Sequence, residues 1–112
     1  MRERISIVSM ASVSALGAAQ DEIWQNYLEN RSFIKEKDFE KFSAPVSSIS
    51  AEHWQEINAL KKIKNYKELD PLVLMAIYCS RKAFENASWK DKEFGVNIGS
   101  SRGATSLFEK YH

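Results

Sequence analysis

The stretch LDPLVLMAIYCSRKAFENA, residues 69–87, carries the strongest secondary-structure signal of the 112-residue chain. Asp70 can accept hydrogen bonds from backbone N–H groups at a helix start. Pro71 suits the first helical position, because its missing N–H would be unpaired there. Apolar side chains then run without interruption from Leu72 to Cys79. A helix that is apolar around most of its circumference is buried on more than one side. The sequence therefore predicts a helix that needs more cover than a small domain supplies.

Two stretches, one before and one after this helix, have the composition of β-strands. Residues 4–16 are rich in short side chains and alternate Ile5 and Ile7 with Ser6, which predicts a strand that Gly17 ends. Residues 94–100 place apolar side chains at every second position and predict another strand. Two strands alone make a poor sheet. The mismatch between this small sheet and the long apolar helix indicates part of a larger α/β fold.

The other segments are expected to be helices or connections. Apolar residues at helical spacing predict a helix within residues 18–30 and another within 51–63, with Ser50 as the N-cap of the second. A Gly/Ser/Arg turn at residues 99–103 leads into the start of a last helix. The remaining stretches are predicted to be a loop or short edge strand at 31–49 and a polar turn at 89–93.

Composition excludes several classes of function. The chain has 16 Lys and Arg against 15 Asp and Glu, a net charge of +1, so nothing in its charge favours nucleic acid or an anionic membrane as a partner. No apolar run approaches the length of a membrane span. One cysteine excludes an internal disulfide and is typical of a reducing compartment. Glu3 and the serines that interrupt the N-terminal apolar stretch argue against a signal peptide. A cytoplasmic protein is therefore expected.

The residues that most often carry chemistry form no recognisable site. Cys79 lies in the middle of the apolar helix, far from a helix N-terminus that would lower its pKa, and is interpreted as a small core residue. His53 falls in the first turn of an amphipathic helix and is expected at the surface, and His112 ends the sequence. Their spacing matches neither a zinc site nor a catalytic triad. No metal is predicted.

The turn GSSRGATS, residues 99–106, is the one candidate for binding an anion. It lacks both the Gly-Lys-Ser/Thr of a P-loop and the three glycines of a dinucleotide fingerprint. Ser100, Ser101 and Arg102 nevertheless precede a helix start, where backbone N–H groups and a guanidinium can hold an anion. The alternative, which we favour, is that Gly99 and Gly103 only permit a sharp turn from strand to helix.

Three stretches, taken in order, resemble the start of a β-ketoacyl synthase, a condensing enzyme of the thiolase fold. Residues 5–34 look like its opening strand, its Ser-x-x-Gly turn at Ser14 and Gly17, and a helix ending in L-x-x-x-R-S-x-I. Residues 69–87 are similar to its long Ala-rich helix. Residues 94–112 look like the next strand, the I-G-S-x-x-G turn and a helix with x-E-x-x-H. The resemblance spans nearly the whole chain.

The resemblance implies an α/β fold: residues 1–112 would be the N-terminal part of a thiolase-like domain of layered helices and a mixed sheet, incomplete by itself. Two departures point to a divergent branch serving a polyketide or pigment pathway rather than general fatty acid biosynthesis. The family's Gly-x-Gly is replaced at Ser9 and Ala11, and residues 35–68 are shorter or reworked.

The resemblance also implies a reaction and its partners. The parent enzymes are acyltransferases that load an acyl group onto a cysteine and then form a carbon–carbon bond by decarboxylative condensation. They use thioesters of acyl carrier protein, need no cofactor, and work as homodimers or heterodimers. The nucleophilic cysteine and the two catalytic histidines of the family lie beyond the matched region. Cys79, His53 and His112 are therefore not expected to be catalytic, and the chain alone is expected to be inactive.

Arg102 is the residue here to which the resemblance assigns a place near substrate. The family position projects toward the acyl tunnel and is commonly apolar, so a guanidinium would shorten or polarise the pocket, unless it turns outward to solvent or a dimer mate. Two other functions stay open. One is a non-catalytic pairing or binding module related to condensing enzymes. The other is a small anion-binding α/β protein that uses Ser100, Ser101 and Arg102.

Overall fold

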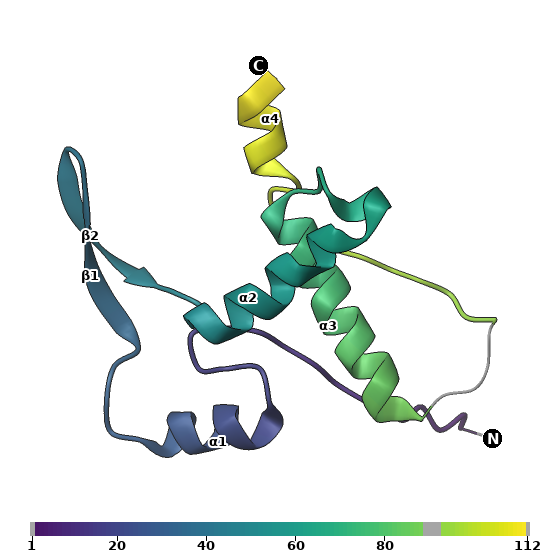
Figure 1. Cartoon of the computed structure of the whole chain (residues 1–112). Helices are drawn as coiled ribbons and strands as arrows, with labels where there is room; N and C mark the ends of the chain where they lie inside the picture. Colours follow the sequence, from purple (N-terminus) through teal and green to yellow (C-terminus); the bar gives the residue numbers. More distant parts are fainter. Residues whose placement is uncertain (1, 89–92, 112) are drawn as a thin grey trace. The chain divides into compact units, whose positions relative to one another are not determined.

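The computed structural model describes residues 2–88 and 93–111, which mix helices with a small antiparallel sheet (Figure 1). The chain divides into two compact units, Ala11–Ala59 and Met1–Met10 together with Leu60–His112. No helix among the described residues is long and apolar enough to span a bilayer. The predicted α/β class is confirmed. The elements in chain order are α1 (Gln20–Leu28), β1 (Ile34–Phe39), β2 (Phe42–Ser47), α2 (Ala51–Ala59), the 3₁₀ turns η1 (Leu60–Lys62) and η2 (Lys64–Tyr66), α3 (Pro71–Ala87) and α4 (Thr105–Tyr111).

Helix α3 begins where the sequence predicts. Asp70 is its N-cap and accepts a hydrogen bond from the Leu72 N–H at 2.8 Å, with Pro71 in the first turn. Leu74 and Tyr78 lie one turn apart and are buried, whereas Leu72 and Phe84 are exposed. Only one stripe of this helix is fully covered, so the described chain leaves α3 with less cover than its apolar sequence calls for, as the sequence predicts.

The other three predicted helices are also present as α1, α2 and α4. The expected cap of α2 is confirmed, since the His53 N–H donates to the Ser50 hydroxyl at 3.2 Å. Helix α2 ends at Ala59 and tightens into η1, so it is shorter than the predicted span of 51–63. The polar turn predicted at 89–93 lies almost wholly outside the described residues.

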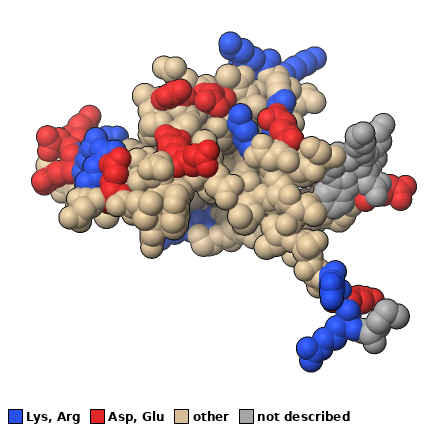
Figure 2. Space-filling model, turned by 90° about the horizontal axis from the view of Figure 1, so that it is seen from below, with Lys and Arg blue, Asp and Glu red and all other residues tan. Residues whose placement is uncertain are grey.

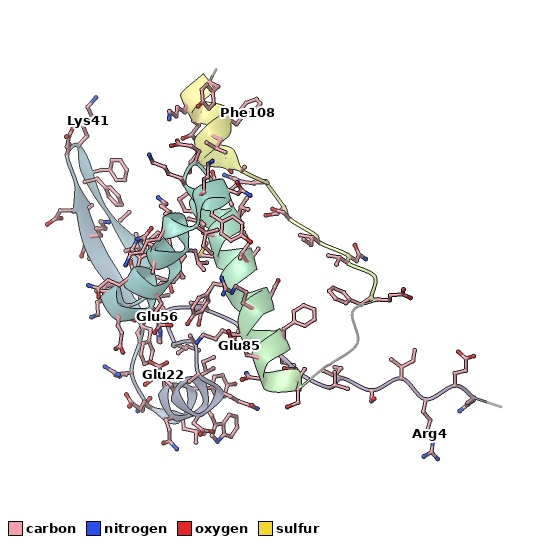
Figure 3. All side chains as sticks on the ribbon, turned by 45° about the vertical axis from the view of Figure 1, so that its right-hand side comes forward. Arg4, Glu22, Lys41, Glu56, Glu85 and Phe108 are labelled. Carbon is pink, nitrogen blue, oxygen red and sulfur yellow. The ribbon has the colours of Figure 1, made fainter. Side chains whose placement is uncertain are left out.

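The two predicted strands are absent. Residues 4–16 and 94–100 hold no strand, and only Ser14 and Gly17 form an isolated antiparallel bridge. Arg4 lies on this irregular N-terminal segment, and Ile5 nearby is 96% exposed (Figure 3). Strands exist only when a neighbour satisfies their backbone N–H and C=O groups. No described segment pairs with either stretch, so their strand-like composition does not produce a strand.

The sheet lies instead in the segment predicted as a loop or short edge strand. Strands β1 and β2 form an antiparallel hairpin in which Phe39 faces Phe42, with ring centroids 5.1 Å apart. Pro45 pairs with Glu36 in this hairpin. Proline is tolerated here because both strands of a two-stranded sheet are edge strands. The backbone edge at which Pro45 lacks an N–H donor can then face solvent, where no strand needs that donor.

A polar corner precedes α1 in the unit formed by residues 11–59. The backbone of Gly17 exchanges two hydrogen bonds with Ser14, at 3.0 and 3.1 Å, which confirms the turn expected there. Gly17 has φ of +121°, a conformation that L side chains rarely adopt. The Glu22 side chain folds back over Gly17, and its carboxylate accepts from the Ala18 N–H at 3.0 Å. A glutamate at the third helical position that reaches back to the helix start is half of a capping box.

Gly17→Ala should destabilise this unit. A methyl group at residue 17 would overlap the Glu22 carboxylate and would also force an unfavourable φ. We expect a loss of about 1 to 3 kcal/mol in the free energy of unfolding, measured by urea titration of the chain. Gly95→Ala is the matched control, since a Cβ there meets nothing within 4 Å. Equal unfolding curves for the two variants would contradict the role given to Gly17.

Candidate functional site

The turn from residue 99 to residue 105 is tightly organised. The Gly103 N–H donates to the Ser100 hydroxyl at 2.9 Å, and the Thr105 N–H donates to the Gly103 carbonyl at 3.0 Å. Gly103 has φ of +66°, so glycine is favoured there, whereas Gly99 is not in a positive-φ conformation. The interpretation as a sharp turn is therefore confirmed at Gly103 and not at Gly99.

Asp70 connects this turn to helix α3. Its Oδ1 atom accepts from the Leu72 N–H at 2.8 Å, and its Oδ2 atom accepts from the N–H groups of Ser106 and Leu107 at 3.0 and 3.3 Å. Asp70 is 2% exposed. These bonds, that of Leu72 foremost, hold the pKa of Asp70 below its ordinary value. One buried carboxylate thus caps two helices whose starts lie far apart in sequence.

This arrangement bears directly on the anion-binding hypothesis. Two first-turn N–H groups of α4, which an external anion would use, already donate to Asp70. The Ser100 hydroxyl also has a partner in the turn. Ser101 and Arg102 are exposed and remain as possible contacts. An anion here would lie close to a buried negative charge, so the geometry argues against the site, which stays a prediction.

Arg102 lies on the exposed side of the turn. Within residues 2–88 and 93–111, no carboxylate is within ion-pair distance of its guanidinium. The side chain is therefore held by no charged group of the described chain. Its expected place beside an acyl pocket stays a prediction.

Cys79 lies within α3 and is half-buried. Burial raises the pKa of its thiol above the ordinary value, so the neutral, weakly nucleophilic form dominates near neutral pH. This environment is that of a small packing residue, as the sequence indicates. His112 is outside the described residues.

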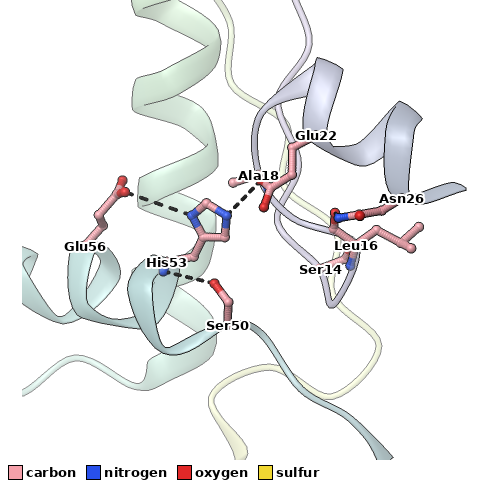
Figure 4. Close-up of polar contacts among 8 residues, drawn as sticks. All are labelled: Ser14, Leu16, Ala18, Glu22, Asn26, Ser50, His53 and Glu56. Atoms are coloured by element: carbon pink, nitrogen blue, oxygen red, sulfur yellow. Dashed lines mark hydrogen bonds and ion pairs between the residues drawn. The ribbon is translucent and has the colours of Figure 1, made fainter. Parts of the chain in front are cut away.

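His53 differs from its expected place at the surface. Its side chain is only 12% exposed, and its Nε2 lies 2.9 Å from Glu22 Oε2 (Figure 4). Because an ionised carboxylate can only accept, Nε2 must carry the proton of this hydrogen bond. The Nδ1 atom is buried and lies 3.9 Å from Glu56 Oε1. His53 thus links the start of α2 to the corner before α1 and is a structural residue of that unit.

The sequence did not predict the bond between Glu22 and His53 or the bond between Asp70 and the start of α4. A signal for Glu22 was available, since a glutamate at the third helical position is typical of a capping box. No local signal indicates that His53 would reach Glu22, or that Asp70 would reach Ser106.

Neither the charge on the face shown in Figure 2 nor a metal-like cluster among the described residues marks a site. Acidic and basic side chains are interspersed on the face shown in Figure 2, without a continuous patch of either sign. No group of three or more His, Cys, Asp or Glu side chains in the described ranges is arranged to hold a metal ion. The turn that bears Arg102, organised by Asp70, is therefore the candidate functional site.

The Glu22 contacts predict acid sensitivity of the unit that contains them. The Ala18 N–H, and then His53, lower the pKa of Glu22 below its ordinary 4.5 in the folded chain. The resulting stabilisation is present above pH 4.5 and is lost as the pH falls through the lowered pKa. In urea titrations between about pH 6 and about pH 3 we expect Glu22→Gln to be less stable near pH 6 and to depend less on pH. Glu85→Gln, on α3, should keep the pH dependence of the unmodified chain. Parallel curves for all three proteins would refute this account.

Comparison with known families bears on what this chain is. A family model described as the N-terminal domain of β-ketoacyl synthases matches residues 2–112. Searches among curated proteins and among solved structures gave no match. The family match covers nearly the whole chain, including the Ser14–Gly17 turn, the Asp70-capped helix and the turn at Arg102. The chain therefore belongs to the β-ketoacyl synthase family, and its match is to the N-terminal domain of that family.

Proposed function

We propose that this chain is the N-terminal part of a condensing enzyme. In the complete protein an acyl group would pass from acyl carrier protein to a cysteine, and a decarboxylative condensation would then form the new carbon–carbon bond. The observation that carries the proposal is the family match over residues 2–112. The enzyme would act as a homodimer or heterodimer, in a polyketide, pigment or fatty acid pathway.

The groups that perform the chemistry would lie outside these residues. Cys79 is a half-buried thiol with a raised pKa, and His53 is bonded to Glu22. Neither side chain is placed as a nucleophile or base facing a substrate. The proposed contribution of this chain is to shape the acyl pocket and to supply part of the fold that supports the catalytic residues.

A second candidate is a non-catalytic pairing module related to condensing enzymes. The observation in its favour is the amount of exposed apolar surface, because large exposed apolar areas mark interaction sites. The exposed apolar residues in the segments predicted as strands are Ile5, Ile7, Val8, Met10, Phe94, Val96 and Ile98. A condensing-enzyme part that needs the rest of its fold would expose the same residues.

The behaviour of the purified chain separates these two candidates. If the chain is part of a condensing enzyme, we expect polydisperse association through its exposed apolar residues in sedimentation velocity, and no turnover of acyl thioesters. A soluble monomer or discrete dimer with a cooperative unfolding transition would support the pairing module. Turnover of a thioester by the chain alone would contradict both.

Arg102 is proposed to limit the acyl chains that the complete enzyme accepts. An unpaired guanidinium beside an apolar chain costs several kcal/mol, and no described carboxylate pairs with Arg102. Arg102→Ile in the complete synthase should raise kcat/KM for long saturated acyl groups by about tenfold or more. Arg102→Lys should keep the preference, and Arg81→Ile, at an exposed position on α3, should have no effect on it. Unchanged activity of Arg102→Ile on long chains would count against the proposal.

A further inference from the structure

We propose that Asp70 is a positioning residue for Arg102. Its one buried carboxylate caps the starts of both α3 and α4. This inference rests on the proposed function of Arg102 for its consequence in catalysis. The bonds from Asp70 to Leu72, Ser106 and Leu107, which we call the clamp, do not depend on that function. Asp70 touches no substrate in this account and acts only through the turn at residues 99–105.

The two carboxylate oxygens of Asp70 accept from different helix starts, and the inference rests on this geometry. Oδ1 bonds to the Leu72 N–H two residues ahead, whereas Oδ2 bonds to Ser106 and Leu107, across 36 and 37 positions of the sequence. A buried carboxylate is tolerated only when hydrogen bonds replace its lost water. Asp70 therefore needs α4 in place, and α4, which has seven residues, needs Asp70 to satisfy its first N–H groups.

The turn transmits this constraint to Arg102. Two hydrogen bonds flank this residue: the Gly103 N–H donates to the Ser100 hydroxyl within the turn, and the Ser106 N–H at the start of α4 donates to Asp70. Gly103, with φ of +66°, follows Arg102 directly and sets the direction of the chain. The local bond and the bond to Asp70 together restrict the backbone of Arg102, although its side chain is exposed. The direction in which the Arg102 side chain leaves the backbone is then set by where Asp70 holds α4.

Asp70→Asn separates the two halves of the clamp. Asparagine is as good an N-cap as aspartate, so its one carbonyl oxygen can keep the local bond to Leu72. The NH₂ group that replaces the second oxygen is a donor and cannot accept from Ser106 or Leu107. Asp70→Ala removes both halves. Ser50→Ala is the matched control, since it removes the cap of α2 at His53 and leaves α4 untouched.

Amide hydrogen exchange of the complete synthase, read by mass spectrometry with fragmentation to single residues, tests the clamp. In Asp70→Asn the N–H groups of Ser106 and Leu107 should exchange about tenfold faster or more, while Leu72 keeps its protection. In Asp70→Ala all three should exchange faster, and in Ser50→Ala none of them should. Unchanged protection at Ser106 and Leu107 in Asp70→Asn, or no protection of these amides in the unmodified chain, would overturn the clamp.

Acyl-chain preference in the complete synthase tests the positioning role. The ratio of kcat/KM for long over short acyl groups should shift in Asp70→Asn as it does in Arg102→Ile, and the double variant should shift no further. A uniform loss of activity at all chain lengths in Asp70→Asn, beside a shifted ratio in Arg102→Ile, would overturn positioning and leave the role of Arg102 standing. An unchanged ratio in Arg102→Ile would overturn both roles, and the exchange experiment would still decide the clamp.

Discussion

The carboxylate of Asp70 is the constraint on which the unit containing α3 and α4 depends. It is buried and accepts from backbone N–H groups at two helix starts, so it fixes those starts against each other. Helix dipoles favour this arrangement, since the positive ends of both helices meet one negative charge. A neutral cap could serve one helix, but only a carboxylate offers two acceptor atoms without a donor.

Much of the local structure follows from the sequence because its causes are local. The starts of α2 and α3 follow from Ser50 and Asp70, and the turn before α1 follows from Ser14 and Gly17. Each of these features involves residues only a few positions apart. The helix starts and the tight turns could therefore be predicted, whereas the end of α2 could not, because no glycine or proline marks it.

The strands and the long-range hydrogen bonds depend on contacts between distant segments, which a single stretch of sequence does not reveal. Residues 4–16 and 94–100 have the composition of strands but no partner among the described residues, whereas the polar segment around Pro45 has one and forms a hairpin. The same limit applies to the site. The bond between Glu22 and His53 joins residues 31 positions apart, and the bond between Asp70 and Ser106 joins residues 36 positions apart. No local sequence pattern predicts either bond.

In each unit a carboxylate links two helices, because little apolar packing is available to place them. The buried hydrophobic side chains of the described chain are Ile57, Leu74 and Tyr78, which is little apolar burial for a chain of this length. With so small a core, the relative placement of short helices falls to directional bonds. Glu22 provides these bonds in one unit, by accepting from the Ala18 N–H and from the His53 ring on α2. Asp70 provides them in the other, by accepting from backbone N–H groups at the starts of α3 and α4. Such bonds specify geometry more strongly than they add stability, because each is exchanged for a bond to water on unfolding. A turn held in this way can present Arg102 in a defined position even where apolar packing around it is sparse.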